Sequence, residues 1–118
     1  MPRNMSFAMT IEQVRNQSKD VTRRFGWWFL KPGDKVWAVE KSMGIPAGET
    51  IKRICMIEII STRAEPLNAI TARDCTREGF PHYAPDGFVQ MLVDHYGVNS
   101  DKRCNRIEFR YLTEGRHE

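Results

Sequence analysis

Alternation of apolar and polar positions predicts strands near both ends of the chain and two more between them. Residues 4–9 are short and apolar enough for one strand, and residues 35–41 alternate around β-branched and aromatic side chains. The run at 52–63 is rich in isoleucine and alternates little, which is typical of a strand covered on both faces. Residues 103–112 alternate again. We therefore expect the 52–63 strand to lie at the centre of a curved sheet.

Three segments carry helix signals. Thr10 begins a capping box, in which its hydroxyl and the glutamine three residues later would close the first turn of a helix over residues 11–17. Thr71 begins a second capping box, for a helix that stops near Gly79. A third helix, from about residue 85 to 96, is predicted because apolar side chains recur on one face before a glycine.

Strands at both ends with helices between them predict an α+β fold. We expect a small mixed β-barrel of about five to six strands with two to three short helices, because closure removes exposed strand edges. The chain has 118 residues, enough for one such domain and too few for two. Residues 1–118 are therefore predicted to form a single domain.

Composition narrows the class of protein. Hydrophobic residues make up 41% and charged residues 28%, a balance typical of a globular protein. No run of about 18 apolar residues is present, so no membrane span is expected. The first residues lack the apolar stretch of a signal peptide, and we expect a cytoplasmic location.

Cysteine and histidine usage gives no pattern for a metal. Cys55, Cys75 and Cys104 are an odd number without a CxxC spacing, and the three histidines are scattered. We expect no disulfide framework, no metal and no cofactor. The net charge of +3 is compatible with an anionic partner. Arginine outnumbers lysine about two to one, which suits phosphate contacts and base stacking but equally serves surface ion pairs.

Three motifs occur in an order that points to a known family. Lys19-x-x-Thr22-x-Arg24 lies between the first helix and an aromatic loop. Leu-Lys-Pro-Gly-Asp at 30–34 leads into a strand, and Arg-Ile-Glu-Phe at 106–109 lies in the last strand. Together they resemble the activating-signal-cointegrator homology (ASCH) family of the PUA-like superfamily. That resemblance covers nearly the whole chain and implies a PUA-like barrel that binds RNA or a modified nucleobase.

The family signature, Gly-x-Lys-x-x-Glu-x-Arg, is matched in part. Lys19 and Arg24 agree with it, whereas Gln17 and Thr22 replace its glycine and glutamate. Threonine at that position also occurs in a small bacterial branch that resembles a minimal amidohydrolase, which removes the acetyl group from N4-acetylcytidine. The lysine, threonine and glutamate of that branch correspond to Lys19, Thr22 and Glu78, which the resemblance implies are catalytic.

The chemistry of amide hydrolysis fits these side chains. Thr22 would act as the nucleophile or orient a water, and Lys19 would act as base if burial lowered its pKa. Glu78 would orient Lys19 or pass a proton to the leaving amine, and Arg24 would pair with a phosphate or a carbonyl oxygen. The lysine and threonine, three apart, would lie on the same side of one helical turn or loop. In the alternative, purely structural interpretation, they are a solvated lysine and a capping hydroxyl.

Four aromatic rings surround one glycine in the segment Phe-Gly-Trp-Trp-Phe at 25–29. Such rings beside arginines stack on unpaired bases in nucleic-acid modules, but they also plug barrel ends. We expect Trp27 or Trp28 to be partly exposed and to line the cleft. The predicted ligand-binding residues are Arg23, Arg24, Trp27, Trp28 and Lys31.

Three functions follow as hypotheses. The first is binding of RNA, single-stranded nucleic acid or a modified nucleoside in a basic, aromatic-lined cleft. The second is deacylation of an N4-acetylcytidine-like nucleoside, and the third, ranked last because the motif holds no histidine, is ribonuclease activity. A buried Lys19 beside Thr22 and Glu78 would favour the enzyme, and an exposed one aligned with Arg23 and Arg24 would favour phosphate binding.

Overall fold

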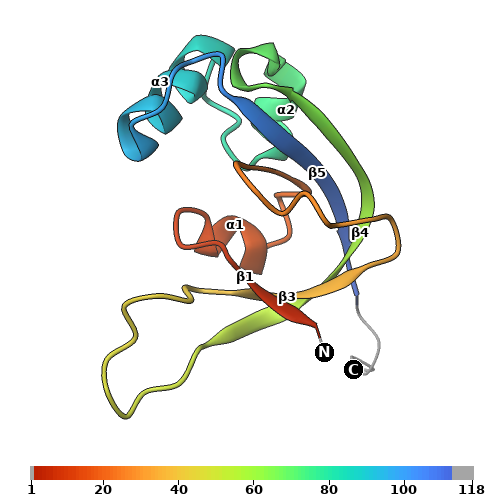
Figure 1. Cartoon of the computed structure of the whole chain (residues 1–118), viewed down its shortest axis with the longest axis vertical. Helices are drawn as coiled ribbons and strands as arrows, with labels where there is room; N and C mark the ends of the chain where they lie inside the picture. The colour runs from red at the N-terminus through yellow and green to blue at the C-terminus, as the bar shows by residue number, and fades with distance from the viewer. Residues whose placement is uncertain (1, 113–118) are drawn as a thin grey trace.

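The computed structural model describes residues 2–112, and its strands form one mixed sheet of five (Figure 1). The elements in chain order are β1 (Arg3–Ser6), α1 (Ile11–Arg15), β2 (Val21–Arg24), β3 (Lys35–Val39), β4 (Arg53–Pro66), a 3-10 turn (Leu67–Ala69), α2 (Ala72–Arg77), α3 (Pro85–Tyr96) and β5 (Arg103–Tyr111). The sheet order is β1-β3-β4-β5-β2, in which β1 and β3 are parallel and the other pairs antiparallel. As predicted, the isoleucine-rich strand β4 lies at the centre.

The long strands curl the sheet into a half-barrel. β4 and β5 run as a curved pair, with α2 and α3 near one end and β1 and β3 crossing the other (Figure 1). Their register shifts between Ile59 and Ser61, and that of β3 and β4 shifts between Ala38 and Val39. Such irregularities increase the local twist and bend a sheet. The predicted α+β class and small barrel-like sheet with three short helices are confirmed.

Two apolar clusters form the core of the part of the chain that the structure describes. The first packs the curled sheet against α1 and contains Phe7, Val14 and Phe109, each at most 2% exposed. The second lies among α2, α3 and the 3-10 turn, and contains Leu67 and Phe88. Strands β2 and β5 and helix α2 each carry a buried charged residue. The candidate functional site contains these charged residues.

Of the two predicted capping boxes, one is present in the structure and one is not. Thr10 occupies the N-cap position of α1, but its side chain makes no capping bond, so the first predicted capping box is wrong. Gln13 instead donates from Nε2 to the backbone oxygen of Gly79 at 3.2 Å. The Thr71 hydroxyl does accept from the amide of Asp74 at 3.2 Å, as predicted for α2.

The predicted bounds of the third helix match α3, which ends at a left-handed glycine, Gly97, with φ of 65°. That conformation is the usual helix stop and is nearly free of strain only for glycine. Within residues 2–112, no helix is long and apolar enough to cross a membrane.

Candidate functional site

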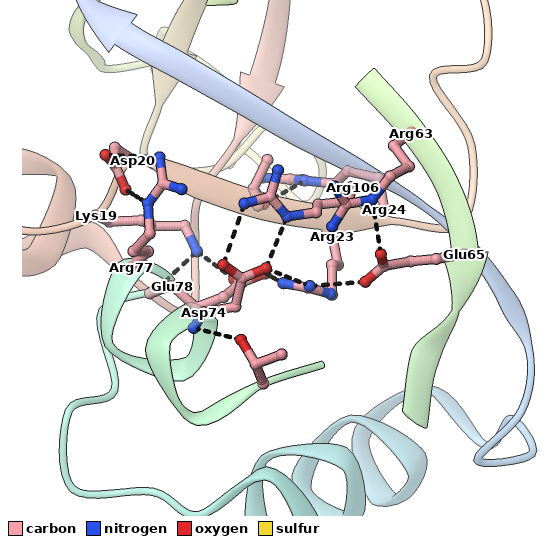
Figure 2. Close-up of polar contacts among 12 residues, drawn as sticks. Lys19, Asp20, Arg23, Arg24, Arg63, Glu65, Asp74, Arg77, Glu78 and Arg106 are labelled. Atoms are coloured by element: carbon pink, nitrogen blue, oxygen red, sulfur yellow. Dashed lines mark hydrogen bonds and ion pairs between the residues drawn. The ribbon is translucent and has the colours of Figure 1, made fainter. Parts of the chain in front are cut away.

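A buried charged network joins β2 and β5 to α2 (Figure 2). Arg23 on β2 and Arg106 on β5 are paired in register and would repel one another. Asp74 of α2 accepts from both, at 2.6 Å from Arg23 Nη2 and 2.7 Å from Arg106 Nε. The hydrogen bonds from Arg106 and Arg23 hold the pKa of Asp74 well below its usual range. Glu65 of β4 adds a second carboxylate, 2.8 Å from Arg23 Nη2.

Lys19 is buried against Glu78 at the end of α2. Its side chain is 3% exposed, and its Nζ lies 2.6 Å from Glu78 Oε1 and 2.9 Å from the Glu78 backbone oxygen. The other carboxylate oxygen of Glu78 accepts from Arg23 Nη1 at 3.0 Å. Burial lowers the pKa of Lys19, and the attraction of Glu78 opposes that shift. The Tyr111 hydroxyl donates to the Lys19 backbone oxygen, which fixes this segment against β5.

Thr22 and Arg24 lie two residues apart on β2 and so share one face of the strand. Arg24 Nε donates to Thr22 Oγ1 at 3.1 Å, and its guanidinium lies 4.7 Å from the centroid of the Phe7 ring. Burial lowers the pKa of Arg24, but a guanidinium stays charged at neutral pH. Arg24 forms no ion pair with any residue in 2–112. Its charge is therefore available to a ligand.

These groups face one cavity of about 370 Å³. Its walls come from the loop after β1, from β2, from the end of α2 and from α3. The three residues predicted as catalytic, Lys19, Thr22 and Glu78, all line it. Its apolar lining includes Phe7, Phe80, Phe88, Met91 and Leu92. The cavity thus places an ionisable pair and a hydroxyl beside apolar and aromatic surface.

The predicted arrangement of these residues needs one correction. Lys19 and Thr22 share neither a helical turn nor a loop, because Lys19 precedes β2 and Thr22 lies within it. Between the described side chains of Lys19 and Thr22 there is no hydrogen bond, since each has another partner. A substrate group or a water would have to lie between them for proton transfer.

The predicted ligand-binding residues lie in different places. Arg23 and Arg24 both line the cavity, but the Arg23 side chain is 1% exposed and its charge is matched by three carboxylates. Trp28 is 53% exposed, as expected for one of the pair, but neither it nor Trp27 lines the cavity. The prediction that one of them lines the cleft is therefore wrong, because the chain turns away from the cavity after β2. Lys31 is exposed and also lies outside the lining.

Sequence reasoning missed several residues at the site. The Thr71 capping box predicts Asp74 only as a residue in the first turn of α2, although its carboxylate neutralises two arginines. His95 and Tyr96, near the end of α3, line the cavity. The signal that could have found His95 is its position in the predicted helix over residues 85–96. Within residues 2–112, no group of three or more histidine, cysteine or acidic side chains is placed to hold a metal ion.

Comparison with known proteins identifies solved structures that have a similar fold. No family model and no curated protein matches this chain. The hypothetical protein PH0355 has a similar structure, with a TM-score of 0.66 and 13% identity over 95% of this chain and 100% of that one. Protein EF3133 from Enterococcus faecalis V583, assigned to DUF984, has a TM-score of 0.60 and 14% identity over 95% of this chain and 76% of that one. Similarity at these identities establishes a shared fold.

Proposed function

We propose that the cavity binds a cytidine-like nucleoside that carries an acyl group on its exocyclic nitrogen, and hydrolyses that amide. The observation that carries this proposal is the buried Lys19, paired with Glu78 and lining one cavity together with Thr22. An ionisable group in a cavity whose pKa is shifted by burial and by a specific charged partner is typical of a catalytic site. The resemblance to the ASCH amidohydrolase branch supplies the substrate class.

The hydrogen bonding of the Thr22 hydroxyl is compatible with a role as nucleophile. Its oxygen accepts from Arg24 Nε, so its own proton remains available for donation to a base. The positive charge of Arg24 also favours the developing alkoxide. Lys19 is the base, because burial lowers its pKa and so increases the neutral fraction of the amine.

The reaction consumes one water. In the direct route, Thr22 and Lys19 orient and deprotonate that water, which adds to the carbonyl carbon. In the acyl-enzyme route, the Thr22 oxygen adds first and water later cleaves the ester. In both routes the C–N bond breaks, the nitrogen takes a proton delivered from Lys19, and the products are the free amine and the carboxylic acid. Arg24 stabilises the oxyanion.

The cavity size and lining support a ligand of this class. About 370 Å³ lies within the usual range of small-molecule sites. Phe80, which is half-buried, offers flat apolar surface to a base, and the exposed Tyr96 offers a polar group to a sugar. An acyl group would point toward Thr22, whose hydroxyl oxygen accepts from the Arg24 guanidinium.

The test is hydrolysis of N4-acetylcytidine by purified protein, followed by chromatography of released cytidine. Thr22→Val removes the hydroxyl at nearly constant volume, and Lys19→Met removes the amine. Each is expected to lower turnover by about 100-fold or more, whereas Thr22→Ser retains part of it. Matched controls are Thr76→Val and Lys52→Met, which replace exposed side chains outside the cavity lining. An acyl-Thr22 adduct in the mass spectrum would select the covalent route.

Absence of cytidine release with enzyme in excess over substrate would refute the hydrolase. The same cavity would then be assigned to binding a modified nucleobase without turnover. Calorimetric titration with N4-acetylcytidine separates the two cases, since a binder gives a saturable signal that Arg24→Met weakens. The aromatic lining and the uncommitted charge of Arg24 favour this second function.

One observation is compatible with ribonuclease activity. His95 lines the cavity, so the site has a histidine that the motif lacks. Histidine is the most common general acid or base in proteins. Cleavage of an RNA oligomer that is lost in His95→Ala, and absent for the 2′-deoxy oligomer, would support this third function in place of the first.

A further inference from the structure

The aromatic segment after β2 forms a turn that is fixed at both ends. The Leu30 amide donates to the Trp27 backbone oxygen at 3.2 Å, which closes the turn. Asn105 of β5 donates from Nδ2 to the same oxygen at 3.0 Å, and Leu30 is buried in the first core cluster. Trp27 packs against that cluster as well. The two residues between these anchors are therefore held in a defined position.

Those two residues, Trp28 and Phe29, are each 53% exposed. Placing two large rings in water forgoes the free energy that their burial would give. Trp27 also has a φ of 62°, in the left-handed region that non-glycine residues rarely adopt. Backbone strain of this kind persists where the surrounding structure enforces it, and it concentrates at functional sites. The exposed rings and the strained backbone of this turn therefore lower the stability of the folded protein.

Cationic residues lie beside Phe29 and directly after the turn. The Arg3 guanidinium lies 4.7 Å from the centroid of Phe29, which itself lies 5.5 Å from that of Trp27. Lys35 lines the same shallow depression as Arg3 and Phe29, and Lys31 directly follows the turn.

None of Arg3, Lys31 and Lys35 forms an ion pair with a residue in 2–112. Two acidic residues lie nearby: Asp34, whose carboxylate accepts from the Lys31 amide, and Glu58, which is the register partner of Lys35 on β4.

We propose that this surface, the aromatic platform of Arg3, Trp28, Phe29, Lys31 and Lys35, binds single-stranded nucleic acid. Exposed rings stack on unpaired bases, and unpaired cations around them contact the phosphates. A rigid platform suits this role, because little ordering is needed on binding. None of its residues lines the cavity, so the platform is a second site that is independent of the proposed hydrolysis.

The test is fluorescence anisotropy with a labelled uridine 12-mer and, in parallel, the thymidine 12-mer, which separates RNA from DNA. Trp28→Ala and Phe29→Ala are each expected to weaken binding by about tenfold, the range found for one stacked base. Trp28→Phe keeps a ring and should retain most of the affinity. Lys35→Met should weaken binding less and flatten its salt dependence, by about 0.7 in the logarithmic slope.

Tyr83→Ala is the matched control, because Tyr83 is an exposed aromatic residue outside the platform. Its affinity should equal that of the wild type. Thermal melting of every variant verifies the fold. The proposal is overturned if the wild type binds neither oligomer, or if Trp28→Ala and Phe29→Ala bind as well as Tyr83→Ala. Self-association by sedimentation that Trp28→Ala abolishes would instead assign the surface to a second copy of the chain. Hydrolysis of the nucleoside is measured separately, so either proposal can fail alone.

Discussion

Neutralising Glu78 is expected to destabilise the protein because it leaves a buried lysine without its counter-charge. Glu78→Gln keeps the shape of the side chain but removes the anion between Lys19 Nζ at 2.6 Å and Arg23 Nη1 at 3.0 Å. Arg23 retains Asp74 and Glu65, so the loss falls mainly on Lys19. Removing one partner of a buried pair typically lowers the free energy of unfolding by about 3–5 kcal/mol.

The second half of the prediction concerns the double variant. Lys19→Met with Glu78→Gln removes both charges, and replacing a buried pair by neutral groups is often close to neutral. We therefore expect the double variant to regain most of the stability that Glu78→Gln loses. This requires a coupling of about 2 kcal/mol or more between the two sites.

Urea unfolding followed by circular dichroism measures both quantities. With a slope near 2 kcal/mol per molar, Glu78→Gln should lower the midpoint by about 2 M. Glu12→Gln is the control, since that side chain is 77% exposed and its pair with Arg15 contributes little. A loss below about 1 kcal/mol for Glu78→Gln, or additive effects in the cycle, would refute the reasoning.

Three further results are expected. The pKa of Asp74 is lower in the folded than in the unfolded chain. The Asp74 carboxylate therefore stabilises the fold fully above about pH 4, and this contribution is lost as the pH falls. Melting temperatures measured between pH 7 and 2 should fall less steeply for Asp74→Asn than for the wild type. Burial raises the pKa of the Cys104 thiol to about 11. Iodoacetamide at pH 8 should therefore label it far more slowly in the native than in the unfolded protein, and equal rates by mass spectrometry would contradict this. Gly79→Ala should destabilise by more than 1 kcal/mol in urea, because φ is 98° and the new Cβ would lie 2.7 Å from Gln13 Cγ; Gly97→Ala, also at positive φ but with open space around it, should cost less.

Elements with strong local signals could be predicted from sequence. The isoleucine-rich run of β4, the face and glycine stop of α3, and the Thr71 cap each depend on neighbours along the chain. Strand β2 could not be predicted in this way. Its sequence, Val-Thr-Arg-Arg, has little apolar alternation, and it is a strand because β5 pairs with it and acidic side chains from α2 and β4 neutralise its buried arginine.

The site was predictable only in part. The resemblance identified Lys19, Thr22 and Glu78, and the structure brings these three to one cavity. It could not give the position of Arg23, whose burial depends on carboxylates 42 to 55 residues away in sequence. Nor could it show that the tryptophan turn leaves the cavity, because the direction of a loop is set by its anchors, here Asn105.

The face-to-face arginines of β2 and β5 bear on the order in which the protein folds. Residues 21–24 pair with residues 105–108, so this strand pair forms only after nearly the whole chain is available. Arg23 and Arg106 oppose that pairing until Asp74 of α2 lies between them. Docking of α2 and closure of the sheet edge are therefore coupled, because each stabilises the other. The cavity wall that holds Lys19 and Thr22 depends on the same strand, since Tyr111 of β5 donates to the Lys19 backbone oxygen.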